Sequence, residues 1–183
     1  MESIAATSGT PQSATIDTAF AAPLVATVLD KGSNPVSGAT VTFTAPTTGA
    51  SGTFANGTNT TTATTNASGV ASSTAFTANG TAGGPYTVTA TVAGVSTPAN
   101  FSLTNTAGTP ASITATSGTP QSATIDTAFA APLVATVLDK GSNPVSGVTV
   151  TFTAPASGAS GTFANGTITT CLLYTSSPSP ASR

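Results

Sequence analysis

The stretch PLVATVLDKGSNPVSGATVTFTAP, residues Pro23 to Pro46, contains two runs of alternating side chains on either side of a polar segment. Successive side chains of an extended chain point to opposite sides. The second run therefore turns Val41 and Phe43 inward and the threonines around them outward. The first run places three apolar residues on one face, namely Leu24, Ala26 and Val28. The pattern predicts two strands, each with one buried face.

The segment between the runs, DKGSNPVSG, is a cluster of turn-forming residues. We expect the side chain of Asp30 to bond its own backbone, as aspartates in turns do. Gly32 is expected to supply a positive φ, and Pro35 to fix φ after Asn34. The cluster predicts a turn that joins the two strands.

The sequence repeats itself almost letter for letter. Copies start at Ser3 and Ser112, a period of 109 residues. Up to Thr61 and Thr170 the copies differ only at Ala5/Thr114, Ala39/Val148, Thr47/Ala156, Thr48/Ser157 and Asn59/Ile168. The period is too long for a solenoid repeat and has the size of one sandwich domain of about 100 residues.

The remainder of the first copy predicts further strands. Three stretches have the strand pattern: SGTFANG around Phe54, the polar TNTTTATTN, and ANFSLTN with Phe101 and Leu103. PYTVTATVAG is the clearest, with one face formed by Tyr86, Val88, Ala90 and Val92. In SGVASSTAFTANG, Phe76 breaks the alternation, which predicts a β-bulge. No segment has a helical apolar period, and about seven to nine strands are the number of an immunoglobulin-like sandwich.

The strand and turn motifs occur in an order that resembles a known family. LVATVLDKGSNPVSGATVTFTAP, followed by TTNASGVASSTAFTANGTAGGPYTVTATVAG, resembles the bacterial Ig-like domain of the invasin and intimin type. The resemblance covers the first copy to about Thr106 and the second copy to Thr170. It implies all-β, tandem immunoglobulin-like β-sandwich domains, the second one truncated. Arrays of such domains are typical of bacterial surface adhesins and large secreted proteins, in which they form a stalk.

We expect a complete domain over residues 3–106, a linker over 107–111, the first half of a second domain over 112–170 and a tail over 171–183. The tail resembles the translation of a transposase-type sequencing adaptor, apart from an extra serine and the Ala181-Ser182 pair. We interpret it as non-native; a natural extension or a frameshift is the alternative. It has no sustained alternation, so it is not expected to complete the second domain. Four core residues are then expected to face water: Leu133, Val137, Val150 and Phe152.

The composition excludes several classes of function. Charged residues make up 4% of the chain, against about 25% in ordinary soluble proteins. The net charge is −2, so no basic surface exists for nucleic acid. No apolar run approaches the ~18 residues that span a bilayer, so we expect no membrane segment here. With a single Cys and no Trp, the chain lacks the disulfide and tryptophan of antibody-type domains, and its sheets must be held by packing alone.

Candidate chemical groups are few, and we predict no catalytic, cofactor-binding or metal-binding residues. Asp17 and Asp126 are expected to end or cap a strand. Asp30 and its copy Asp139, even with Asn34, supply too few oxygens for calcium.

Other reactive or modifiable groups have equally ordinary interpretations. Lys31 and Lys140 lie in polar turns, unlike the buried lysine of a covalent Lys–Asn cross-link. Tyr86 is expected in the core rather than in a sugar-binding platform. N-glycosylation motifs occur at Asn56, Asn59, Asn66, Asn79 and Asn165. We attribute them to chance, because the chain is rich in Asn and Thr.

The predicted function is structural. We expect a stalk or spacer repeat of a bacterial cell-surface or secreted adhesin, extracellular and not an enzyme, whose partners are neighbouring repeats. Host or surface glycans or receptors would bind elsewhere in the protein. The alternatives are a carbohydrate- or receptor-binding module, or an accessory repeat of a secreted polysaccharide-active enzyme or a phage fibre.

Overall fold

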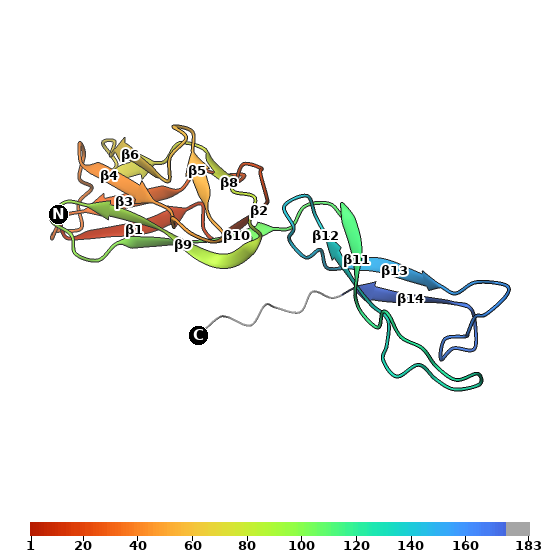
Figure 1. Ribbon diagram of the computed structural model, residues 1–183. Helices are drawn as coiled ribbons and strands as arrows, with labels where there is room; N and C mark the ends of the chain where they lie inside the picture. Colours follow the sequence, from red (N-terminus) through yellow and green to blue (C-terminus); the bar gives the residue numbers. More distant parts are fainter. Residues whose placement is uncertain (175–183) are drawn as a thin grey trace. The chain divides into compact units, whose positions relative to one another are not determined.

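The computed structural model describes residues 1–174 and shows an all-β protein (Figure 1). The chain forms two compact units, Met1–Ala107 (unit 1) and Gly108–Arg183 (unit 2). Over the described residues there is no helix, and hence none long and apolar enough to cross a membrane. The serines, prolines and arginine that close the predicted tail lie outside the described part of the chain.

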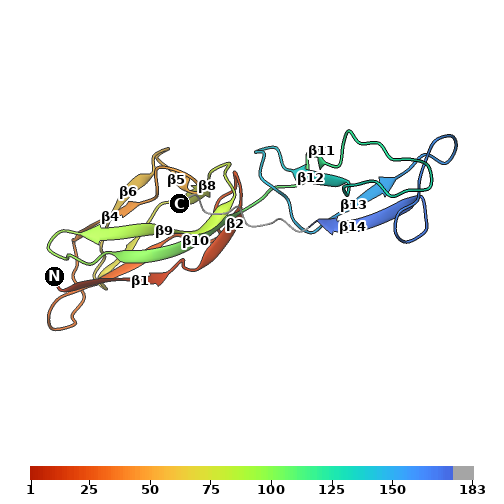
Figure 2. The same cartoon turned by 60° about the horizontal axis from the view of Figure 1, so that its bottom comes forward.

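Unit 1 is an immunoglobulin-like sandwich of two main sheets. Its strands are β1 (Ser3–Ser8), β2 (Gln12–Thr15), β3 (Val25–Leu29), β4 (Thr40–Thr44), β5 (Gly52–Phe54), β6 (Thr60–Thr64), β7 (Val70–Ser72), β8 (Phe76–Ala78), β9 (Gly83–Val92) and β10 (Ala99–Thr106). One sheet has the order β1-β3-β7 and the other β2-β10-β9-β4-β6, while β5 and β8 form a separate pair. Figure 2 shows β9 and β10 side by side along the unit.

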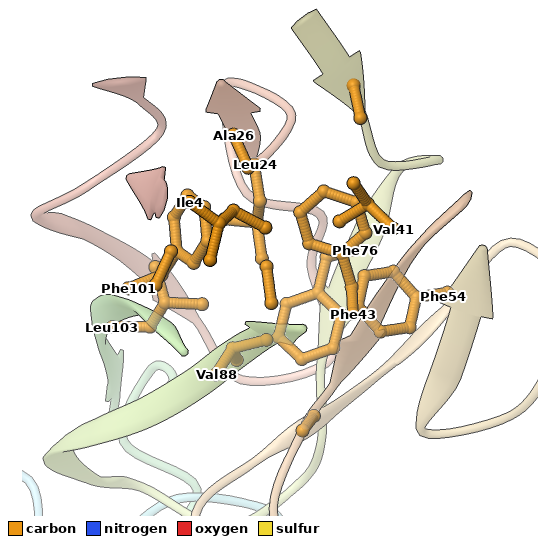
Figure 3. Close-up of a cluster of buried hydrophobic side chains, with 14 of the residues drawn as sticks. Ile4, Leu24, Ala26, Val41, Phe43, Phe54, Phe76, Val88, Phe101 and Leu103 are labelled. Atoms are coloured by element: carbon orange, nitrogen blue, oxygen red, sulfur yellow. The ribbon is translucent and has the colours of Figure 1, made fainter. Parts of the chain in front are cut away.

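The core of unit 1 lies between the two main sheets. The predicted inward residues of β3, β4, β9 and β10 are buried, except for the half-buried Tyr86, and the intervening threonines face outward. Leu24 reaches into the middle of the cluster (Figure 3). The rings of Phe54 and Phe76 pack 4.7 Å apart, and those of Phe43 and Phe101 5.9 Å apart, within the range of favourable aromatic pairs.

Two local expectations were wrong. The stretch around Phe76 is not one bulged strand but two strands: β7 pairs with β3, and β8 pairs with β5. Ser73 lies at the switch, where its buried hydroxyl accepts a hydrogen bond from the amide of Leu24 at 3.0 Å. In the Asp30 turn the positive φ falls on Ser33 (φ 62°), not on Gly32.

The chain enters and leaves unit 1 at opposite ends. β10 pairs with β2 in parallel, and the amide of Ile16 donates to the carbonyl of Thr106 at 2.9 Å. Thr106 therefore lies at the far end of β2, whereas Ser3 begins β1 at the other end, beside Leu29. Figure 1 shows the N-terminus at one end of unit 1 and the exit of β10 at the other.

Unit 2 reproduces only part of this architecture. Its described strands are β11 (Ser112–Ser117), β12 (Val134–Leu138), β13 (Val148–Thr153) and β14 (Thr169–Tyr174). β11 pairs with β12 in the register of β1 and β3, and β13 pairs with β14 in the register of β4 and β6. Over the described residues they form two separate two-stranded sheets.

The expected exposure of the unit 2 core was right in part. Leu133 is 46% exposed, and Phe152 is half-buried. Val137 and Val150, expected to face water, are buried at 4% and 8% exposure. Both residues line one shallow hollow, together with Pro110 and Ala111 of the segment before β11.

The start of the tail also differs from expectation. Cys171 to Tyr174 continue β14, and Leu172 lies opposite Val150 as Ala63 lies opposite Val41. Ladder hydrogen bonds use backbone groups only, so β13 can pair with residues of foreign side chains. The side chains gain little cover, because Leu172 and Leu173 remain 56% and 64% exposed.

Candidate functional site

The Asp30 turn of unit 1 is closed by its own carboxylate. Oδ1 of Asp30 accepts the amides of Gly32 and Asn34, both at 2.8 Å. The side-chain amide of Asn34 donates to both carboxylate oxygens, at 3.1 and 3.2 Å. The backbone amide of Asn34, followed by its side-chain amide, holds the pKa of Asp30 below its ordinary value. The predicted turn role of Asp30 is what the geometry shows.

The copy of this turn in unit 2 has an additional donor. Asp139 keeps the bonds to the amides of Gly141 and Asn143, at 2.8 and 2.9 Å. Its Oδ2 also accepts the amide of Gly108, from the segment that precedes β11, at 2.8 Å. Asp139 is buried, whereas Asp30 is half-exposed. Burial works to raise the pKa of Asp139, but the amides of Gly108, Asn143 and Gly141 outweigh it and hold the pKa below its ordinary value.

The carboxylates of Asp30 and Asp139 accept hydrogen bonds from backbone and side-chain N–H groups. They hold chain segments together and are not presented to solvent as a catalytic acid or base. Within residues 1–174 no three His, Cys, Asp or Glu side chains gather as they would around a metal ion. Lys31 and Lys140 are exposed. Asp17 and Asp126 are exposed and occupy left-handed turn conformations, with φ near 60°. The structure brings none of these residues together.

Unit 1 contains a buried polar network around Asn105 that the sequence patterns did not predict. Asn105 is 2% exposed and takes the inward position after Phe101 and Leu103. Its amide nitrogen donates to the carbonyls of Ser51 and Thr81 and to Oδ1 of Asn79, at 2.8, 3.1 and 3.0 Å. The alternation of ANFSLTN, which places an Asn at a core position, was the available signal.

Tyr86 completes this network. Its hydroxyl donates to Oδ1 of Asn105 at 2.8 Å, and burial raises the pKa of Tyr86 to about 12. The ring is half-buried against the core, as expected, and its polar end is satisfied inside the protein. Such a ring is not free to stack on a sugar.

The asparagines of the glycosylation-type motifs support turns. The amides of Asn56, Asn59 and Asn79 donate to the carbonyls of Thr60, Ala45 and Gly49, respectively. Oδ1 of Asn66 accepts the amides of Ser68 and Val70. Asn165 repeats the role of Asn56 by donating to Thr169 at 3.1 Å. These bonds give each residue a structural reason to be Asn.

The open core face of unit 2 contains a concave feature. A shallow hollow of about 340 Å³ lies between its two sheets. Its apolar lining includes Ile113, Val137, Val148 and Val150. The copies of these residues in unit 1 all belong to the closed core: Ile4, Val28, Ala39 and Val41. The hollow is therefore an unfilled core and has no polar groups arranged for a small ligand.

Comparison with known proteins gives one structural likeness. The chain is similar to the crystal structure of invasin, a bacterial integrin-binding protein, with 24% sequence identity and a TM-score of 0.45. The match covers 92% of this chain and 32% of that chain, so this chain spans about a third of that length. No protein-family model matches the chain, and no curated protein matches it.

Proposed function

We propose that the chain is a spacer segment of a bacterial surface or secreted adhesin, built from tandem immunoglobulin-like repeats and without enzymatic activity. The opposite placement of entry and exit in unit 1 carries this proposal. Because β10 leaves at the far end of β2, a following repeat starts where the preceding one ends. Each added repeat would then increase the length of the array.

The surface of unit 1 supports a mechanical role. The five-stranded sheet presents threonines outward, such as Thr40, Thr62 and Thr91, with no charge among them. Specific interfaces are usually centred on exposed aromatic or Arg side chains. Phe43, Phe54 and the other phenylalanines of unit 1 are instead buried in the core. Neighbouring repeats, rather than a soluble ligand, are the proposed partners.

The connection between repeats supports a stiff array. The segment before β11 contains Pro110, and its Gly108 amide is held by the carboxylate of Asp139. Short linkers that contain proline and are bonded to a domain restrict rotation.

The proposal is tested by measuring length. Proteins with one, two and four tandem copies of residues 3–111 would be compared by small-angle X-ray scattering. From Ser3 to Thr15 the chain runs along the unit in β1 and β2; the span is at most about 40 Å at ~3.3 Å per residue, because the chain bends at Gly9 between the two strands. We expect the maximum dimension to grow linearly by about that amount per copy. Growth with the cube root of the copy number would mean compact packing and would overturn the proposal.

A further inference from the structure

We propose that the Asp30 turn of unit 1 binds the chain segment that leads into the unit, through the backbone amide of a glycine in that segment. The partner is an uncharged segment of the type AGTPA, the sequence of residues 107–111. We name the hydrogen bond from this amide to the carboxylate the aspartate–glycine clamp. The inference rests on the proposed array of tandem repeats, and it names the partner of a turn that each repeat contains.

Two turns of identical sequence differ in burial. The sequence DKGSNPVSG begins at Asp30 and again at Asp139. In unit 2, Asp139 is 4% exposed and Asn143 is 8% exposed. Their copies in unit 1, Asp30 and Asn34, are half-buried and exposed, respectively. Because the two turns have the same residues, the additional cover in unit 2 comes from chain outside the turn.

The segment before β11 is bonded to the Asp139 turn. The amide of Gly108 donates to Oδ2 of Asp139 at 2.8 Å. The backbone amides of the turn itself donate to the other oxygen, Oδ1. Where the segment enters β11, the amide of Ala111 donates to the carbonyl of Leu138 at 2.8 Å. The carboxylate therefore has one oxygen for the backbone of its turn and the other for the leading segment.

Unit 1 has the same acceptor and the same path of entry. The amide of Glu2 donates to the carbonyl of Leu29 at 2.8 Å, which repeats the entry bond of unit 2. Among the described residues, Oδ2 of Asp30 accepts only the side-chain amide of Asn34, at 3.2 Å. A carboxylate oxygen has room for a second donor. A segment that continues the path of Glu2 would bring the amide matching Gly108 to this oxygen.

The chemistry of the turn favours an N–H donor over a cation. Oδ1 of Asp30 already accepts the amides of Gly32 and Asn34, both at 2.8 Å. Calcium needs about six to eight oxygen ligands, and in the described part of the chain no second acidic side chain joins Asp30 in a metal-binding group. A glycine suits the donor position, because the absence of a Cβ lets its backbone approach the carboxylate closely.

The clamp reduces the joint between two units to one residue. The amide of Ile16 donates to the carbonyl of Thr106 at 2.9 Å, which holds the last residue of β10 to unit 1. Gly108 is the first residue of unit 2 and is held by Asp139. Only Ala107 lies between these two bonded residues. Each residue that is fixed has less conformational freedom, so we expect clamped joints to be stiffer than unclamped ones.

The direct test gives unit 1 a leading segment. In the full chain, Met1 and Glu2 are replaced by TAGTPA after an initiating methionine, and amide hydrogen exchange is measured by NMR at neutral pH. We expect the amide of the added glycine to be protected at least about tenfold relative to an unstructured amide, as should be Gly108 in the same molecule. An added glycine without protection would overturn the proposal.

Aspartate variants of this extended chain identify the acceptor. Asn in place of Asp keeps one side-chain oxygen and replaces the other by a donor. Asp30→Asn should therefore remove the protection of the added glycine alone, and Asp139→Asn that of Gly108 alone. Asp17→Asn is the matched control, because Asp17 is exposed and its left-handed backbone, with φ 60°, suits Asn. Protection that survives Asp30→Asn would mean that another group holds the segment, which contradicts the proposal.

A proline variant removes the donor and leaves the turn intact. Since Asn143 is buried where the segment is bound, exchange of the Asn34 backbone amide should slow at least about threefold in the extended chain. Proline in place of the added glycine should abolish this slowing, because proline has no N–H. Proline in place of the alanine before it is the control, since the glycine amide remains. Equal effects of the two prolines would exclude the glycine amide as the donor.

The clamp and the spacer function fail on different measurements. In tandem copies of residues 3–111, each further copy is preceded by an AGTPA segment, so scattering and hydrogen exchange can be measured on the same proteins. Linear growth of the maximum dimension with unprotected linker glycines would overturn the clamp and leave the spacer function standing. Protected linker glycines with compact growth would overturn the spacer function and support the clamp.

Discussion

The sequence QSAT occurs once in each unit and has two different structures. In unit 1, Gln12–Thr15 is strand β2, whereas in unit 2 residues 121–124 are not a strand. The same holds for GTF, which is strand β5 at Gly52–Phe54 and irregular at 161–163. Their partners in unit 1 are β10 and β8. The difference shows that these short segments become strands only when a distant partner is present.

The surroundings of equivalent glycines show the same difference between the two units. A Cβ added to Gly52 would lie 2.2 Å from the carbonyl oxygen of Thr77, because β8 runs directly alongside. At Gly161 the same atom would meet nothing within 4 Å. By contrast, a Cβ added to Gly9 or to Gly118 would lie 2.3 or 2.2 Å from the carbonyl oxygen of Pro23 or Pro132, respectively. Contacts within residues 3–61 are therefore kept in their copy in unit 2, whereas contacts of those residues with residues 62–106 are lost there.

The largest expected effect comes from completing unit 2 in the same chain. If the sequence of Thr62–Thr106 is added directly after Thr170, the second unit should fold cooperatively and gain on the order of 5 kcal/mol in free energy of unfolding. Urea unfolding followed by hydrogen exchange should show a second protected unit that includes Phe129. The control carries Asp at the added copy of Val88. If residues 121–124 stayed unprotected, the comparison of the units would be wrong.

A smaller effect distinguishes equivalent core residues. Leu24→Ala should destabilise unit 1 by about 3 kcal/mol, because it leaves a cavity in a closed core. Leu133→Ala should change stability by less than about 0.5 kcal/mol, since the side chain is already exposed. Chemical denaturation of the two variants measures both values. Similar losses would mean that unit 2 buries Leu133 in solution.

The Asn105 network should contribute less than Leu24. Asn105→Ala removes the acceptor of the Tyr86 hydroxyl and a donor to the carbonyls of Ser51 and Thr81, of which Ser51 keeps the amide of Asn79, and we expect a loss of about 2 kcal/mol. Asn100→Ala, at an exposed position of the same strand, is the control and should be nearly neutral. Thermal unfolding of both variants tests the expectation. An equal effect would show that the network adds no stability.

The smallest effect concerns pH and the two aspartate turns. The pKa values of Asp30 and Asp139 are both lowered, so each turn is stabilised above the ordinary pKa of about 4 and loses this contribution as pH falls through the lowered value. Because only Asp139 holds the segment before β11, the protection of the Gly108 amide, measured as its exchange rate relative to that of an unstructured amide at the same pH, should fall as the pH drops below about 4. Asp139→Asn should show fast exchange at neutral pH, whereas Asp30→Asn should not affect Gly108. If the protection of the Gly108 amide changed neither with pH nor with Asp139→Asn, the hydrogen bond to Asp139 would not hold this segment.

The alternating runs made much of unit 1 predictable from sequence. Leu24, Val41 and Val88 take the inward positions expected of them, because the side-chain period of a strand depends only on the extended backbone. The stretch around Phe76 was not predictable in the same way. Its two halves belong to different sheets, and that choice depends on β3 and β5, which are distant in sequence.

The sequence by itself determined the features that close within a few residues or along one hairpin. The Asp30 and Asp139 turns form alike in both units, and the side-chain amides of Gln12 and Gln121 both donate to a glycine carbonyl three residues earlier, at 2.7 Å. Only the tertiary structure decided which of two identical segments becomes a strand and which of two identical leucines is buried. The physical reason is that backbone ladders and apolar burial both need a partner surface, and residues 62–106 supply that surface to unit 1 alone.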